Sequence, residues 1–139
     1  MLEVNALNAY YGDAHVLHDI NLKVNAGQRV SLLGRNGAGK STFLKSVMNA
    51  GPMVEGEVRF EGAALKALPA YKRARLGMAL VPEDRQIFHH LSVLENITMA
   101  RHARAGRQAL TPRQIVERFA MLKPLTERYG GQLSGCLLY

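Results

Sequence analysis

One short segment of the chain has residue types at a spacing that suits phosphate binding. Gly34 to Ser41 read Gly-Arg-Asn-Gly-Ala-Gly-Lys-Ser, which fits the pattern G-x-x-x-x-G-K-[ST] of a phosphate-binding loop, or P-loop. The glycines permit a tight turn, and the backbone N–H groups, the lysine and the serine hydroxyl are suited to phosphates and Mg²⁺. The segment therefore predicts a site for a nucleoside triphosphate.

Each part of the loop has an expected role at the nucleotide. Backbone N–H groups from Asn36 to Ser41 should face the phosphates, and the N-terminus of a following helix adds its positive dipole. Lys40 would neutralise the β- and γ-phosphates, Ser41 would place its hydroxyl on Mg²⁺, and Thr42 would lie on the α-phosphate side. The predicted nucleotide-binding residues are Gly34, Asn36, Gly37, Ala38, Gly39, Lys40, Ser41 and Thr42. The loop alone does not separate transporters, kinases and GTPases.

The other reactive side chains give weaker signals. His89 and His90 are adjacent, but nothing nearby in the sequence would orient either imidazole, so no catalytic role is assigned to them. The single cysteine, Cys136, excludes an internal disulfide framework and a cysteine-based zinc site, and it fits a reducing cytoplasm. Redox chemistry has no support.

The composition is that of an ordinary globular domain with a basic balance. The chain has 139 residues, of which 47% are hydrophobic and 21% charged, and its net charge is +7. The basic residues are spread out, and the two densest groups, Lys72 to Arg75 and Arg101 to Arg107, contain no interleaved aromatics. We interpret both groups as solvated helix faces and expect no nucleic-acid partner. The longest apolar run, Met78 to Pro82, is too short to span a membrane.

The elements that must position the loop can be read from periodicity and capping signals. Alternation or compact apolar runs predict strands at Ile20 to Val24, Arg29 to Leu33, Glu55 to Glu61 and Met78 to Val81. Helices are expected at Ser41 to Met48, Ala70 to Leu76, after Ser92 through about Ala105, and after Thr111, the last two opened by capping boxes. The P-loop thus lies between a strand and a helix, and this context argues against a chance match in a glycine-rich turn.

Further motifs occur in the order found in one family. Tyr11-Gly12 precede the P-loop, Val81 to Phe88 (Val-Pro-Glu-Asp-Arg-Gln-Ile-Phe) and Leu91 to Ile97 follow it, and Leu133-Ser134-Gly135 come last. With these motifs the sequence resembles the ATP-binding subunits of ABC transporters from its N-terminus to Gly135. Arg35 and the motif Pro-Glu-x-Arg-x-Ile-Phe are most similar to the ATPases of branched-chain amino-acid importers. Relatives of those ATPases serve importers of urea or short amides.

The resemblance implies roles for residues outside the P-loop. Tyr11 matches the aromatic residue that stacks on adenine, although Tyr11 could be an ordinary sheet aromatic and neighbouring Tyr10 could take the stacking role instead. Glu83 lies in the family's Q-loop, where most members have a glutamine that helps to hold Mg²⁺ and the attacking water and touches the membrane partner. An exposed loop glutamate is the alternative reading. Ser134 and Gly135 are the remnant of the signature L-S-G-G-Q.

The implied fold is the α/β, P-loop NTPase, ABC-type ATP-binding domain, incomplete, with an N-terminal antiparallel β region and the start of the helical subdomain. Its parts are predicted as follows: about 1–81, the β region and P-loop core; about 82–91, the Q-loop; about 92–135, the helical subdomain; 136–139, an aberrant tail.

After Gly135 the sequence departs from the family pattern. The family continues the signature with glycine and then Gln or Glu residues, whereas this chain has Cys136 to Tyr139. The family's second Mg²⁺-binding aspartate and the adjacent glutamate that activates water have no replacement upstream. Hydrolysis is therefore expected to be slow. We favour a frameshift, an early stop or a gene-prediction error over a deliberate truncation. The strands that would lie between Arg29 to Leu33 and Met78 to Val81 are lost, which predicts exposed apolar strand edges and poor solubility.

The function that the resemblance implies is an ATP-binding subunit that couples ATP binding and hydrolysis to import across a membrane. Its implied ligands and partners are ATP, Mg²⁺, transmembrane permease subunits and a second ATP-binding subunit in a head-to-tail dimer. The subunit would lie in the cytoplasm, peripherally on the inner face of the membrane. A non-hydrolysing nucleotide-binding or interaction fragment is the alternative. Another P-loop kinase or GTPase is disfavoured, since the chain has no clear guanine-recognition N-K-x-D.

Overall fold

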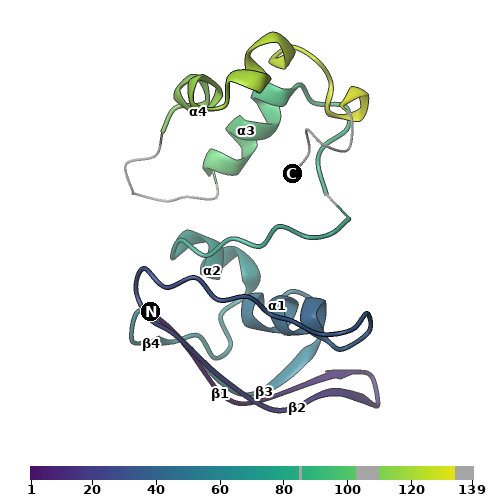
Figure 1. Ribbon diagram of the computed structural model, residues 1–139, viewed down its shortest axis with the longest axis vertical. Helices are drawn as coiled ribbons and strands as arrows, with labels where there is room; N and C mark the ends of the chain where they lie inside the picture. The colour runs from purple at the N-terminus through teal and green to yellow at the C-terminus, as the bar shows by residue number, and fades with distance from the viewer. Residues whose placement is uncertain (85, 103–109, 134–139) are drawn as a thin grey trace. The chain divides into compact units, whose positions relative to one another are not determined.

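The computed structural model describes residues 1–84, 86–102 and 110–133. Contacts divide the chain into two compact units. The first comprises Met1–Arg73 with Met78–Leu80, and the second comprises Ala74–Gly77 with the described residues from Val81 onward. Figure 1 shows the elements of each unit. Among the described residues no helix combines the length and the apolar character needed to cross a membrane.

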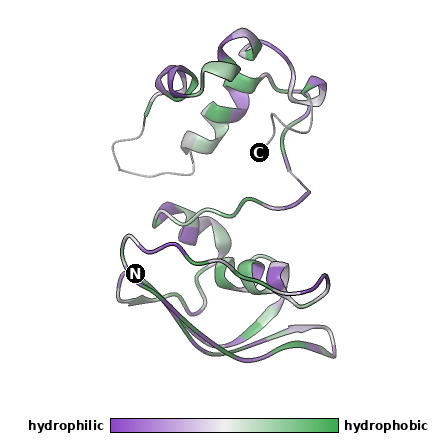
Figure 2. Cartoon of the chain, in the orientation of Figure 1, coloured by the Kyte–Doolittle hydropathy of each residue, from purple (hydrophilic) through white to green (hydrophobic). Residues whose placement is uncertain are grey.

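The first unit is built on a four-stranded antiparallel sheet with the order β2-β1-β3-β4. The strands are β1 (Leu2–Tyr11), β2 (Ala14–Val24), β3 (Met53–Phe60) and β4 (Ala63–Ala64). The central strand β1 pairs Val4 with Leu22 on one side and with Val58 on the other. The strand expected at Ile20 to Val24 lies within β2, and the strand expected at Glu55 to Glu61 lies in β3 except for Glu61, which follows its end; Figure 2 colours the chain by hydropathy.

One helix, α1 (Lys40–Met48), packs against this sheet, as predicted for Ser41 to Met48. Its Phe43 and Val47 join Val4, Leu7 and other strand residues in the buried core of the unit. Apolar residues on one side of α1 thus cover one face of the sheet, which is why an amphipathic helix is stable here. Because the core anchors the helix, it also fixes the position of the helix N-terminus.

The basic stretch around Arg73 is organised differently from our prediction. Helix α2 (Ala70–Arg75) forms where a helix was expected, and Lys72 is exposed, but the Arg73 side chain is only 5% exposed. Its guanidinium donates hydrogen bonds to the backbone carbonyls of Leu68 at 2.9 Å, Val47 at 2.6 Å and Leu65 at 2.8 Å. Burial lowers the pKa of Arg73. The interpretation of this stretch as a solvated face is therefore wrong for Arg73, which joins α1, α2 and the loop between β4 and α2.

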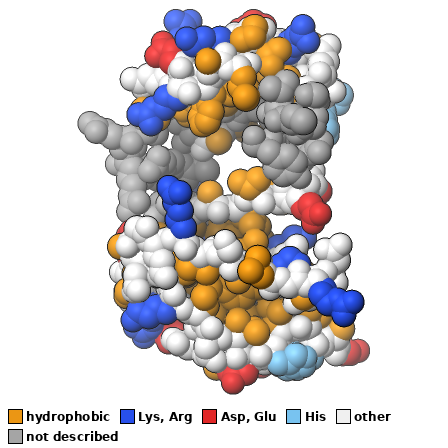
Figure 3. Space-filling model, viewed as in Figure 1, with side chains coloured by type: hydrophobic (Ala, Val, Ile, Leu, Met, Phe, Trp, Pro, Cys, Tyr) orange, Lys and Arg blue, Asp and Glu red, His pale blue; other side chains and the backbone are white. Residues whose placement is uncertain are grey.

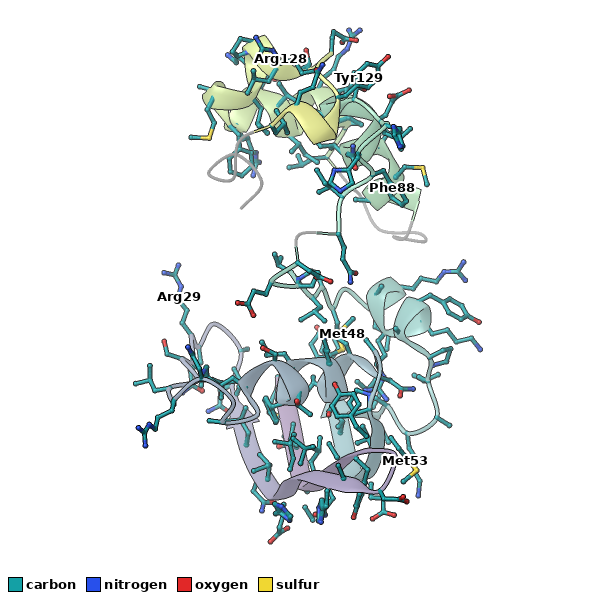
Figure 4. All side chains as sticks on the ribbon, turned by 90° about the vertical axis from the view of Figure 1, so that its right-hand side faces the viewer. Arg29, Met48, Met53, Phe88, Arg128 and Tyr129 are labelled. Carbon is teal, nitrogen blue, oxygen red and sulfur yellow. The ribbon has the colours of Figure 1, made fainter. Side chains whose placement is uncertain are left out.

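Two of the predicted strands are absent. Arg29 to Leu33 and Met78 to Val81 have no strand conformation, and no described strand pairs with either segment. A strand needs a neighbour for its backbone N–H and C=O groups, so an apolar run without a partner does not form one. As predicted, apolar residues of these segments are exposed: Leu33 is 91% exposed and Val81 74%. Figure 3 shows apolar side chains on the surface of the first unit, and Figure 4 shows Arg29 projecting outward.

We therefore expect the isolated chain to be poorly soluble. Unpaired apolar segments favour association between chains, because other chains can supply the missing strand neighbours. Light scattering and recovery after centrifugation at increasing protein concentration would measure this. A cooperative thermal unfolding transition together with well-dispersed amide NMR signals would contradict the prediction.

The second unit is helical. It contains α3 (Val93–His102), α4 (Pro112–Arg118) and two short 3₁₀ helices, η1 (Ala120–Leu125) and η2 (Gly130–Gln132). Both predicted capping boxes are confirmed. The Ser92 N–H donates to the Glu95 carboxylate at 2.7 Å, and the Gln114 N–H donates to the Thr111 hydroxyl at 3.2 Å. Hydrogen bonding by the Ser92 backbone, and then by its side chain, lowers the pKa of Glu95.

Candidate functional site

The P-loop links the segment at Arg29 to Leu33 to the N-terminus of α1. Gly37 has φ 83° and Gly39 has φ 88°, backbone conformations that glycine adopts without strain. Gly39 also lies against β2, because a Cβ built at this position would come within 2.7 Å of Leu17 Cδ2. A larger residue at position 39 would therefore require the Leu17 side chain to move. The glycine predicted from the motif is favoured here chiefly by its backbone conformation.

Lys40 is folded back over the loop that precedes it. Its ammonium donates hydrogen bonds to the carbonyl oxygens of Gly34 at 2.7 Å and Arg35 at 2.8 Å. The loop is closed further by a hydrogen bond of 3.1 Å from the Ala38 N–H to the Arg35 carbonyl. One side chain thus ties both ends of the loop together and places a positive charge at its centre.

The N-terminus of α1 offers unused donors beside that charge. The first intrahelical bond runs from the Phe43 N–H to the Gly39 carbonyl at 2.8 Å. Within the described chain, the N–H groups of Lys40, Ser41 and Thr42 have no such acceptor, and no side chain caps the helix. The first turn contains no acidic residue, and Ser41 is exposed. An anion satisfies such donors and is favoured by the helix dipole. The site therefore suits a phosphate chain.

Tyr10 and Tyr11 lie on opposite faces of β1, because side chains alternate along a strand. The Tyr10 ring stacks on His15 with a centroid distance of 4.3 Å, and its hydroxyl donates to the Glu55 carboxylate at 3.2 Å. Partial burial, and then the bond to Glu55, raise the pKa of Tyr10. Tyr11 lies two residues after the buried Ala9, on the face that α1 covers, and is 45% exposed. Tyr11 is thus the tyrosine with an exposed ring on the side of the P-loop helix.

The other predicted site residues lie elsewhere in the chain. Glu83 is exposed and belongs to the second unit, whereas the P-loop belongs to the first. Its role at Mg²⁺ stays a prediction. Ser134 and Gly135, the signature remnant, and Cys136 lie outside the described residues. His89 and His90 border a surface pocket with Tyr129, Gly131 and Gln132, and both histidines are exposed.

The glycine loop, the lysine over it and the open helix N-terminus define a P-loop nucleotide-binding domain. The profile of the family described as ABC transporter matches residues 17–136 of this sequence. The chain belongs to the ABC transporter family, as its ATP-binding domain.

Several curated relatives match nearly the whole chain. It is 35% identical to the high-affinity branched-chain amino acid transport ATP-binding protein BraG of Pseudomonas aeruginosa, over 97% of this chain and 58% of that protein. It is 31% identical to the probable branched-chain amino acid transport ATP-binding protein LivF of Archaeoglobus fulgidus, with the same coverage of 97% and 58%. The lipopolysaccharide export system ATP-binding protein LptB of Escherichia coli is 33% identical, over 94% and 55%. The chain spans somewhat more than half the length of these relatives.

Solved structures confirm the predicted fold class. The structure of an ATP binding subunit of an ABC transporter is similar with a TM-score of 0.80 and 28% identity, and the match covers 99% of this chain and 57% of that one. The dimeric post-hydrolysis state of the ATP-binding cassette MJ0796, bound to ADP and Pi, is similar with a TM-score of 0.79 at 23% identity, over 99% and 65%. The antiparallel β region and helical unit described above are thus parts of an ABC-type fold.

Sequence reasoning missed two residues that organise the structure around the predicted motifs. Arg73 joins the end of α1 to the loop before α2, and Asn96 contacts the backbone on both sides of His89 and His90. Arg73 lies between other basic residues, and a basic stretch by itself predicts exposure rather than burial. Asn96 is an asparagine inside a predicted helix. Asparagine is uncommon there because its side chain tends to hydrogen-bond to backbone groups, and that tendency was the available signal.

Proposed function

We propose that this chain carries the nucleotide-binding half of a composite ATP site in an ABC transporter. The observation that carries the proposal is the arrangement of Lys40 over the loop beside the free N–H groups of α1. In this assignment the backbone from Asn36 to Thr42 binds the phosphates and Lys40 neutralises their charge. A bound triphosphate would satisfy donors that otherwise face water, which supports ATP as the ligand.

We assign Tyr11 to the adenine ring. Its exposed ring lies on the face of β1 that α1 covers, whereas Tyr10 is held by His15 and Glu55 on the other face. Stacking on an aromatic side chain contributes roughly 1–3 kcal/mol per base. This geometry supports Tyr11 over Tyr10.

The assignment predicts different effects for two neighbouring substitutions. Tyr11→Ala should weaken Mg-ATP binding by about tenfold, because a stacking contact of the usual strength is lost. Tyr10→Ala is the matched control and should change the affinity by less than about twofold. Calorimetric titrations with Mg-ATP and with inorganic triphosphate would separate base from phosphate contacts. Equal losses for both ligands in Tyr11→Ala would argue against adenine stacking.

The residues present fit Mg²⁺ as the companion of the nucleotide. Ser41 follows Lys40 in the open first turn of α1, and its exposed hydroxyl is an oxygen ligand of the kind that Mg²⁺ prefers. We assign Ser41 to the metal and propose that Glu83 contributes through water. When bound, Mg²⁺ would neutralise part of the phosphate charge.

We propose import of branched-chain amino acids as the transport function. BraG and LivF, which are named for that transport, support this choice, and the Arg35 and Pro-Glu-x-Arg-x-Ile-Phe wording agrees with it. The partners would be permease subunits in the membrane and a second ATP-binding subunit in a head-to-tail dimer. Ser134 and Gly135 would face the nucleotide of that second subunit. The chain would then act on the cytoplasmic face of the membrane.

We further propose the division that the sequence predicts: a β region and P-loop core at about 1–81, a Q-loop at about 82–91 and a helical subdomain at about 92–135. The contact boundary near Leu80 supports the first of these divisions. The transport proposal itself is tested by reconstitution. Vesicles that hold the permease subunits of a branched-chain amino-acid importer should take up leucine with Mg-ATP and an intact ATP-binding subunit that contains this sequence, and should not when that subunit carries Lys40→Ala.

A polypeptide of these 139 residues should bind Mg-ATP but hydrolyse it slowly. The sequence contains the phosphate cradle, while the family's water-activating glutamate has no counterpart in it. This polypeptide alone is then a nucleotide-binding module, which binds ATP but does not support leucine uptake. Phosphate release, measured together with Mg-ATP binding, tests this expectation. Lys40-dependent release at the rate of an intact family member would contradict slow hydrolysis.

A further inference from the structure

Within the second unit, one side chain is bonded to the backbone at several points. Asn96 Oδ1 accepts a hydrogen bond from the Phe88 N–H at 2.9 Å. Its Nδ2 group donates to the carbonyl of Phe88 at 3.0 Å, of Leu91 at 3.1 Å and of Ser92 at 3.0 Å. A single amide therefore holds the turn from Phe88 to Ser92 against helix α3.

The turn held in this way is in contact with a segment much later in the chain. The Gly130 N–H donates to the Leu91 carbonyl at 2.8 Å, and the Gly131 N–H donates to the His89 carbonyl at 3.1 Å. The orientation of both acceptors depends on the turn. Phe88 and Tyr129, which flank this contact, are labelled in Figure 4.

The packing at Gly130 is close enough to exclude a side chain. A Cβ built there would lie 2.9 Å from Ile87 Cδ1, 3.0 Å from the Phe88 carbonyl oxygen and 3.4 Å from Asn96 Nδ2. At the neighbouring Gly131 the nearest atom to a built Cβ is 3.4 Å away, which is an ordinary contact. The chain thus has a glycine in tight contact next to one that is not.

We propose that Asn96 is a positioning residue that joins two parts of the nucleotide machinery. It holds the last part of the Q-loop segment, the turn from Phe88 to Ser92, in the geometry that binds the segment just before Leu133. The turn and the segment then move as one body, so a displacement of the turn is passed to Gly130 and Gly131. The functional use of this joint rests on the proposed ATP site, whereas the joint itself is a property of the second unit alone.

The first test compares amide hydrogen exchange in the wild-type chain and in Asn96→Ala. The amides of Gly130 and Gly131 should exchange about tenfold faster in the variant, because their acceptors are no longer held. The amides of Val93 and Leu94 provide an internal control. They donate to the carbonyls of Arg128 and Thr126, which Asn96 does not touch, and should keep their protection.

Two further variants refine the result. Asn96→Asp replaces the Nδ2 donor by a carboxylate oxygen that the carbonyls of Phe88, Leu91 and Ser92 repel, so Gly130 and Gly131 should lose protection as in Asn96→Ala. Thr98→Ala removes the bond of 2.7 Å from a hydroxyl on the same helix to the Leu94 carbonyl and should leave Gly130 and Gly131 unchanged. If Asn96 merely stabilises α3, Asn96→Ala will raise the exchange of Val93 and Leu94 as much as that of Gly130 and Gly131, which overturns the proposal.

A reciprocal test keeps Asn96 intact and decides the matter if Asn96→Ala does not fold. Gly130→Ala should raise the exchange of the Phe88 amide about tenfold, because the added methyl pushes against the turn. Gly131→Ala is the matched control and should not. Equal exchange at Phe88 in both variants would overturn the proposal. Mg-ATP binding, measured separately by calorimetry, tests the ATP site. A negative result in either experiment therefore does not affect the conclusion from the other.

Discussion

Replacing Lys40 by alanine should weaken Mg-ATP binding by at least about a hundredfold. The ammonium bridges the carbonyls of Gly34 and Arg35 and places a cation beside the open N-terminus of α1. Hydrogen bonds that involve a charged group contribute roughly 1.5–3 kcal/mol each, and a nucleotide gains at least one such bond to Lys40. The variant loses this bond and also the loop geometry that presents the N–H groups of α1.

Calorimetric titration with Mg-ATP measures this effect, with Lys45→Ala as the matched control. Lys45 lies in the last turn of the same helix, so its loss changes the net charge equally but leaves the loop intact. Its affinity should stay within about threefold of wild type. Circular dichroism should show that both variants keep their helical content. Wild-type affinity in Lys40→Ala would contradict the assignment of the P-loop as the nucleotide site.

The second large effect is expected from Arg73→Ala. The substitution removes the donor to the Val47 carbonyl and one of two donors to the carbonyls of Leu65 and Leu68, and it removes a side chain from a buried position. An unsatisfied buried polar group costs about 1–3 kcal/mol, so the local stability should fall by roughly 3 kcal/mol. That loss corresponds to about a hundredfold faster exchange of protected amides.

Amide exchange at the junction of α1 with the following loop reports this change directly. The Asn49 and Ala50 amides, which cap α1, and the Leu68 amide should lose protection. Lys72→Ala is the control on the same helix, and because Lys72 is exposed its effect should be within about 0.5 kcal/mol. Unchanged exchange in Arg73→Ala would show that the three carbonyls find water or other donors.

Features that depend on neighbouring residues were predictable. The P-loop, the helix after it and both capping boxes follow from the residue types within a few positions. The strand segments in β2 and β3 were found because one buried face imposes a period of two. The two failures, Arg29 to Leu33 and Met78 to Val81, also have local apolar patterns. Pattern alone predicted strands there, but a strand requires a partner, and no described strand pairs with these segments.

The sequence by itself determined the phosphate cradle and the family, because both depend on residue types in a particular order along the chain. Only the tertiary structure placed Tyr10 and Tyr11 in different surroundings, buried Arg73 within a basic stretch and brought Asn96 and Gly130 to the same turn. These outcomes depend on which segments distant in sequence approach one another. Burial and hydrogen-bond partners arise from that approach, and no local spacing records them.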